Sequence, residues 1–167
     1  MAKRAARSTG EAVPGVKSLD RMVGTWKVSG GARGTVRYEW FDRKSALIQH
    51  VSLGDTRGFE VIRFDQDSQS WRSWFFDRSG STVLEYTYEV DAEQLKISID
   101  MDDRHGAFVA RFSDGGNVLE GRWDWTQAGK KMGYNATLTR VRKGARRRSG
   151  KNARKVGRAS GARRRSH

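Results

Sequence analysis

The sequence predicts an all-β protein: a single up-and-down antiparallel β-barrel of about ten strands, with a short N-terminal helix and disordered basic tails. Three observations predict this class. Short segments of alternating apolar and polar residues follow one another along most of the chain. Tight turns rich in Gly and Asp separate these segments, and no long helical pattern interrupts them. A meander of this length favours closure, which removes exposed strand edges, and a two-sheet sandwich is the alternative.

The first predicted element is a short helix over residues 19–23. Ser18 precedes it and suits its N-terminus, because a serine side chain accepts a hydrogen bond from free backbone amides of the first turn. Gly24 follows it and favours the end of the helix.

Ten strands follow this helix. The most regular alternation is in residues 94–101, where Leu95, Ile97, Ile99 and Met101 alternate with polar residues. The turns contain the residues that hairpin loops require, above all glycine, which adopts positive φ without strain. The predicted strands are 24–29, 35–42, 46–53, 58–64, 70–77, 82–90, 94–101, 107–113, 118–126 and 132–141.

Charge divides the chain into three parts. The net charge is +14, but the segment 18–141 holds seventeen basic and eighteen acidic residues. Residues 142–167 contain twelve basic residues and no acid. The organisation predicted from this distribution is a basic disordered leader over 1–17, a barrel over 18–142 and a disordered Arg/Lys-rich tail over 143–167.

The composition also excludes several classes of protein. The chain has no cysteine, so it has neither disulfides nor a thiolate metal site. No apolar run follows the basic N-terminus as in a secretory signal, and no window is apolar enough for a membrane-spanning helix. A cytoplasmic location is the resulting expectation.

The segment Gly24-Thr25-Trp26, which opens the first strand after a short helix, resembles the lipocalin-like (calycin) barrels. In that superfamily an arginine near the end of the last strand packs across the tryptophan ring and closes the floor of the barrel. Arg140 stands in the matching place here, with Arg142 as a substitute. A guanidinium over an indole contributes about 0.5–2 kcal/mol. The resemblance therefore implies that Gly24, Trp26 and Arg140 are structural closure residues.

More narrowly, residues 18–142 resemble a bacterial lipocalin-like family described as a domain of unknown function. The resemblance implies a barrel able to hold a small apolar ligand, and it supplies no reaction. The matching segments are Leu19 with Gly24-Thr25-Trp26, Tyr38-Glu39-Trp40, Phe59-Glu60-Val61-Ile62-Arg63-Phe64-Asp65 and Trp74-Phe75-Phe76-Asp77-Arg78-Ser79-Gly80.

Aromatic residues supply the candidate pocket. The chain has six Trp, four Tyr and seven Phe, which favour either a ligand pocket or ordinary packing of the core and barrel ends. Glu60 shares its strand face with Ile62 and Phe64, so it is the acid best suited to orient the polar end of a ligand; a solvated outer face is the alternative. The candidate pocket residues are Tyr38, Trp40, Glu60, Ile62, Trp74, Phe76 and Trp123.

Haem is a further alternative, since some calycin-type barrels bind ferric haem through one histidine. His50 is the candidate ligand, whereas His105 follows acidic residues in a predicted turn. The haem-type relatives extend the first motif with further glycines, and Val28 occupies the first of those positions here. The sequence therefore favours no cofactor.

The residues do not indicate catalysis. There is no nucleophile elbow, no cysteine and no histidine cluster that would hold a metal. An isomerase or cyclase acting inside the barrel would require Glu60 or His50 to face inward with a perturbed pKa. A non-enzymatic barrel is the principal prediction.

The C-terminal tail is the second functional signal. The run Gly-Ala-Arg-Arg-Arg-Ser occurs twice, at 144–149 and 161–166. A flexible arm of this charge is expected to bind RNA or DNA by counterion release, so a nucleic-acid-associated protein is the alternative function. A low-complexity extension without a partner is a further alternative, and an anionic membrane is less favoured because no amphipathic face accompanies the charge. The residues predicted to bind polyanions are Arg146, Arg147, Arg148, Lys151, Arg154, Lys155, Arg163, Arg164 and Arg165.

Overall fold

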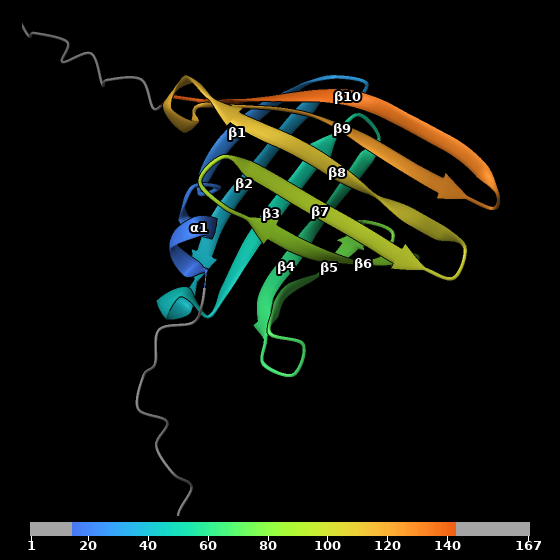
Figure 1. The fold of residues 1–167 in the computed structure, drawn as a ribbon, viewed down its shortest axis with the longest axis horizontal. Coiled ribbons are helices and arrows are strands. Elements are labelled where there is room, and N and C mark those ends of the chain that lie inside the picture. Colours follow the sequence, from blue (N-terminus) through green and yellow to red (C-terminus); the bar gives the residue numbers. More distant parts are fainter. Residues whose placement is uncertain (1–14, 143–167) are drawn as a thin grey trace, which may run out of the picture.

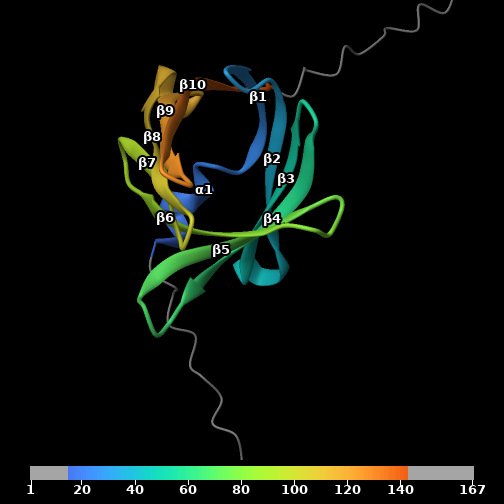
Figure 2. The same cartoon turned by 90° about the vertical axis from the view of Figure 1, so that its right-hand side faces the viewer.

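The computed structural model describes residues 15–142, and these form a closed barrel of ten antiparallel strands. Each strand pairs with the next along the chain, and the first strand pairs with the last. Figure 1 shows the barrel from the side, with α1 at one end, and Figure 2 shows it from the opposite end. The predicted fold class, an up-and-down barrel with a short helix before it, is confirmed.

The strand bounds agree closely with the alternating segments of the sequence. The helix is α1 (Val16–Asp20), and the strands are β1 (Gly24–Gly30), β2 (Gly34–Phe41), β3 (Ala46–Leu53), β4 (Thr56–Asp65), β5 (Ser70–Asp77), β6 (Val83–Val90), β7 (Gln94–Met101), β8 (Arg104–Ser113), β9 (Val118–Gln127) and β10 (Lys130–Arg140).

The helix begins earlier than predicted. Its N-cap is Gly15, with φ 77°, in place of Ser18. Val16 and Leu19 lie three residues apart, so they share one helix face, and both pack against the barrel core. This apolar pair favours a helix over 16–20, so α1 begins within residues 1–17, the segment that the sequence assigned to the leader.

The hairpin between β9 and β10 is tighter than predicted. Gln127 pairs with Lys130, and the two residues between them, Ala128 and Gly129, have φ 47° and 77°. Two central residues with positive φ match the twist of antiparallel strands. Lys130, which the sequence assigned to the turn, is therefore the first residue of β10.

The end of the barrel next to α1 is filled by side chains. Trp26 is fully buried, and its indole Nε1 donates a hydrogen bond of 2.8 Å to the carbonyl of Met22. Leu19 and Met22 are buried beside it, and Leu47 and Ile62 belong to the same core cluster. This packed end closes the barrel on one side.

Alternation along each strand separates an inner face from an outer face. On β9, Leu119, Trp123 and Trp125 face the interior, while Glu120 is exposed on the outer face between Arg111 and Thr137 of the neighbouring strands.

Within residues 15–142, no helix has the length and apolarity needed to cross a membrane.

Candidate functional site

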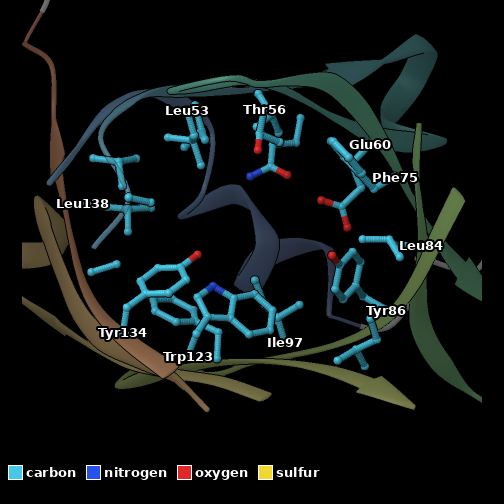
Figure 3. A pocket seen from close by; sticks show the side chains of 18 of the residues that line it. Leu53, Thr56, Glu60, Phe75, Leu84, Tyr86, Ile97, Trp123, Tyr134 and Leu138 are labelled. Carbon is cyan, nitrogen blue, oxygen red and sulfur yellow. The ribbon is translucent and has the colours of Figure 1, made fainter. Parts of the chain in front are cut away.

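A cavity of about 710 Å³ occupies the barrel interior beyond the packed end. Its lining includes residues of the loops at the end opposite α1, which places its mouth there. In Figure 3 side chains project into it from strands on opposite walls, with Glu60 on one wall and Trp123 and Tyr134 on the other. Ten strands make a barrel wider than the eight that side chains alone fill, so a hollow interior is the expected consequence.

One wall of the cavity is aromatic. The rings of Phe108 and Trp123 stack with centroids 5.5 Å apart, and Tyr86 lies 6.1 Å from Trp123. The rings of Trp125 and Tyr134 meet edge to face at 5.8 Å. These contacts hold the rings in place, so the wall presents fixed apolar surfaces to the cavity.

The opposite wall carries a buried polar cluster, defined here as Tyr38, Gln49, Glu60, Ser73 and Tyr88. Glu60 is only 4% exposed; Ser73 donates to its Oε1, and Tyr88 donates to its Oε2 over 3.0 Å. Gln49 donates to the Tyr38 hydroxyl over 2.6 Å. Cross-strand register brings Tyr38, Gln49 and Glu60 side by side on β2, β3 and β4. The cluster therefore gives an otherwise apolar cavity one polar region.

Burial changes the acidity of this cluster. Burial in the barrel interior raises the pKa of Glu60 to about 7, although the hydrogen bonds from Ser73 and Tyr88 oppose the shift. Burial and the nearby Glu60 also raise the pKa of Tyr38 and of Tyr88 above the ordinary value. The two tyrosines are therefore neutral, and Glu60 changes its charge near neutral pH.

Three predicted pocket residues, Tyr38, Glu60 and Trp123, line the cavity. Trp40 and Ile62 face inward but lie at the packed end, outside the cavity lining. Trp40 donates a hydrogen bond of 2.6 Å from Nε1 to Asp20 of α1, and Ile62 is fully buried. Their position makes them part of the core that supports the cavity.

The placement of Trp74 and Phe76 in the pocket is wrong. On β5 the buried residues are Trp71, Ser73 and Phe75, so Trp74 and Phe76 point to the outer face. Phe76 stacks there on Phe59, with ring centroids 5.2 Å apart. The strand is apolar on both faces, and alternation alone does not identify the inner one.

The predicted contact between Trp26 and Arg140 is present. The two residues pair across β1 and β10, and the guanidinium carbon lies 4.1 Å from the centroid of the indole. Arg140 also donates hydrogen bonds of 2.5 Å to the carbonyls of Val23 and Arg21 and one of 3.3 Å to that of Gly116. The arginine thus joins the last strand to the chain between α1 and β1.

Gly24 belongs to the same contact for a steric reason. Its φ is 126°, and a Cβ at this position would lie 2.9 Å from Nη1 of Arg140. Any other residue would be strained there and would crowd the guanidinium. Arg142, the substitute for Arg140, is exposed.

The two histidines of the barrel, His50 and His105, both lie outside the cavity lining. His50 lies on the outer face of β3 with its Nε2 2.8 Å from Oε1 of Glu39, within hydrogen-bond distance, so it does not reach the cavity as a haem ligand would. His105 is exposed, but it lies in β8 and not in a turn, 2.5 Å from Asp100. In the part of the chain that the structure describes, no cluster of three or more His, Cys, Asp or Glu could hold a metal ion.

All residues predicted to bind polyanions lie in 143–167, outside the described residues, so tail-mediated binding of RNA or DNA stays a prediction.

Sequence reasoning missed Gln49, Ser73, Tyr88 and Arg104. Gln49 had a usable signal, because it lies between Leu47 and Val51 on one strand face, as Glu60 does among apolar residues. Tyr88 had a signal as well, because Leu84, Tyr86 and Tyr88 alternate with Glu85, Thr87 and Glu89 along β6. Ser73 had none, since a small hydroxyl is common on either face of a strand.

The sequence matches no known protein-family model and no curated protein. The functional argument therefore depends on the cavity itself.

Proposed function

We propose that this protein is a lipocalin-like barrel that binds one small, mostly apolar molecule in its cavity. The observation that carries the proposal is a cavity of about 710 Å³ inside a barrel whose other end is tightly packed. Ligand sites in proteins have volumes of about 300–1,000 Å³ and combine apolar walls with a few polar groups. The aromatic wall and the buried polar cluster match this description.

The polar cluster gives the bound molecule an orientation. Both hydroxyls that contact Glu60 donate to it, and Glu60 lines the cavity, so in its ionised form it has further lone pairs that can accept from a ligand. A ligand hydroxyl or amide N–H would satisfy them, while the rest of the molecule contacts Phe108, Trp123 and Tyr134. The preferred ligand thus has an apolar body and at least one hydrogen-bond donor.

Titration with the neutral fluorophore N-phenyl-1-naphthylamine tests the proposal. We expect saturable binding to the wild type and a loss of at least about tenfold in affinity for Leu84→Trp, because Leu84 lines the cavity and an indole would fill it. Val83→Trp is the matched control, since Val83 is the preceding residue of β6 and is 46% exposed outside the barrel. Equal affinity in the two variants, or no uptake by the wild type, would contradict a ligand-binding cavity.

Glu60 favours a second candidate function, proton transfer of the isomerase type. A buried carboxyl with a pKa of about 7 beside a cavity has the acidity that a general base needs at neutral pH. Incubating wild type and Glu60→Gln with a metabolite extract in D₂O tests it. Deuterium incorporation that requires Glu60 is the expected result, and identical mass spectra for the two proteins would remove this candidate.

A further inference from the structure

The strands β6 and β7 separate before they reach the mouth of the barrel. Their pairing covers only residues 87–90 with 95–98. Beyond this point β6 continues along β5 as far as Val83, and β7 continues along β8 as far as Met101. The facing edges of 83–86 and 99–101 therefore lack a strand partner within residues 15–142, and the barrel wall has a local gap there.

Two carboxylates account for this gap. Continuing the register of the paired residues would place Glu85 directly opposite Asp100, and like charges opposite each other destabilise a strand pair. Glu85 instead forms an ion pair of 2.9 Å with Arg72 of β5. Asp100 lies 2.5 Å from Nδ1 of His105 on β8. Each strand thus pairs with its other neighbour at this height, and the two acids stay apart.

A cleft of about 310 Å³ lies on the outer side of the barrel at this gap, over β5, β6 and β7. Its lining is polar and combines four small hydroxyl side chains, one guanidinium and two carboxylates with one tyrosine. One cation and two anions give the lining a small net charge, which favours a neutral polar group over an ion. The lining residues are Ser68, Ser70, Arg72, Glu85, Tyr86, Thr87, Ser98 and Asp100.

Tyr86 connects this cleft with the inner cavity, because it is the one residue of the described chain that lines both. Leu84 and Ile99, which flank the gap on β6 and β7, also line the cavity. The backbone N–H and C=O groups on the two facing edges need hydrogen-bond partners other than a strand. A ligand group that both donates and accepts hydrogen bonds would supply them.

We propose that the ligand carries a sugar or a similar polyol group, which binds in this cleft while the apolar body of the ligand lies in the cavity. Each hydroxyl of a polyol donates one hydrogen bond and accepts others. Glu85 and Asp100 accept such bonds, and Arg72 donates them. The chain of the ligand passes between β6 and β7 beside Tyr86. This inference depends on the proposed function, because it specifies a second polar group of the bound molecule.

Displacement of N-phenyl-1-naphthylamine by decyl glucoside and by decanol tests the polyol site. The two competitors share an apolar chain and differ by the sugar, and the glucoside is used below the concentration at which it forms micelles. We expect the wild type to bind the glucoside about tenfold more tightly than decanol. Thr87→Trp should abolish this preference without changing the affinity for decanol, because the indole fills the cleft and not the cavity.

Thr137→Trp is the matched control. Thr137 lies on the outer face of β10 and is half-buried, as Thr87 is on β6, so this variant should keep the preference for the glucoside. Equal affinities of the wild type for the two competitors, or a preference that survives Thr87→Trp, would overturn the polyol site alone. Tighter binding of decyltrimethylammonium than of the glucoside would overturn it in favour of a cationic group. Failure of the probe and of decanol to bind would overturn the proposed function as well.

Asp100→Lys tests the gap without filling the cleft. It places opposite charges at 85 and 100, so β6 and β7 should pair as far as the mouth. The amide hydrogen exchange of residues 83–86 should slow, and the preference for the glucoside should be lost. Asp102→Lys makes the same change of charge in the turn after β7 and should alter neither property. Unchanged exchange in Asp100→Lys, or a preference that survives pairing of the strands, would contradict binding at the gap.

Discussion

The two ends of the barrel are built by the same ten strands but are filled differently. Next to α1, large side chains such as Trp26, Met22 and Ile62 exclude solvent completely. At the other end the same strands surround a cavity of about 710 Å³. Figure 1 shows that only the first end has a helix against it.

Because of this difference, we expect the packed end to determine the stability of the barrel and the hollow end to determine its ligand binding. A ten-stranded barrel is too wide for side chains from the strands alone to fill it, so α1 supplies Leu19 and the following Met22 to one end. The end without such a contribution stays hollow. Substitutions at the packed end should therefore act on unfolding, and substitutions at the hollow end on ligand affinity.

The largest effect is expected for Trp26→Ala. The indole is fully buried between the core and Arg140, so its removal should lower the free energy of unfolding by about 3–5 kcal/mol. Denaturant unfolding measures the change. Trp74→Ala removes the same side chain from the outer face and should cost only about 1 kcal/mol. Similar losses in the two variants would contradict the assignment of the packed end.

Glu60 should make the hollow end sensitive to pH. Its pKa is about 7 in the folded protein and near the ordinary glutamate value of 4.5 in the unfolded chain, so the folded state holds the proton more tightly. The stabilising contribution of Glu60 is therefore complete below about pH 4.5 and is lost as the pH rises through 7, by at most about 3 kcal/mol. In Glu60→Gln this contribution should vanish. Unfolding measured from pH 4.5 to 8 checks the prediction, and identical pH profiles would disprove it.

Arg140→Met should destabilise the packed end by about 2 kcal/mol, since it removes a cation from the face of Trp26 and hydrogen bonds to three carbonyls. Arg142→Met is the control, because Arg142 is exposed and should leave stability unchanged. Thermal unfolding compares the two variants, and equal midpoints would show that Arg140 is not needed for closure.

The smallest change in stability is expected at the aromatic wall. Trp123→Leu enlarges a cavity that already exists, so it should cost about 1 kcal/mol while lowering the affinity for N-phenyl-1-naphthylamine several-fold. Fluorescence titration and denaturant unfolding on the same sample separate the two effects. A large loss of stability with unchanged affinity would show that the aromatic wall supports the fold and does not bind the probe.

The sequence was sufficient for the strands and for closure because both have local signals. Turn residues separate the strands, and a short helix before Gly24-Thr25-Trp26 together with an arginine late in the chain pointed to the contact between Trp26 and Arg140. Glu60 was also identified, since its neighbours Ile62 and Phe64 are apolar.

The wall of the cavity was less predictable. In the segment from Trp71 to Phe76 apolar residues occupy both faces, so only the register with β4 and β6 decides that Ser73 points inward. Arg104 was assigned to a turn because it follows Asp102 and Asp103, yet the tight hairpin pairs it with Met101 as the first residue of β8. Both features depend on how neighbouring strands pair, and the residues of one strand alone do not determine that pairing.

Pairing of the first strand with the last also constrains how the protein is made. During synthesis β1 leaves the ribosome long before β10, so Trp26 has no guanidinium to cover it until nearly the whole barrel has emerged. Contacts so distant in sequence form slowly, because a long loop must close first. Until then the nascent chain is an open sheet with the edges of β1 and of its newest strand unpaired, which makes barrel closure the step most exposed to aggregation.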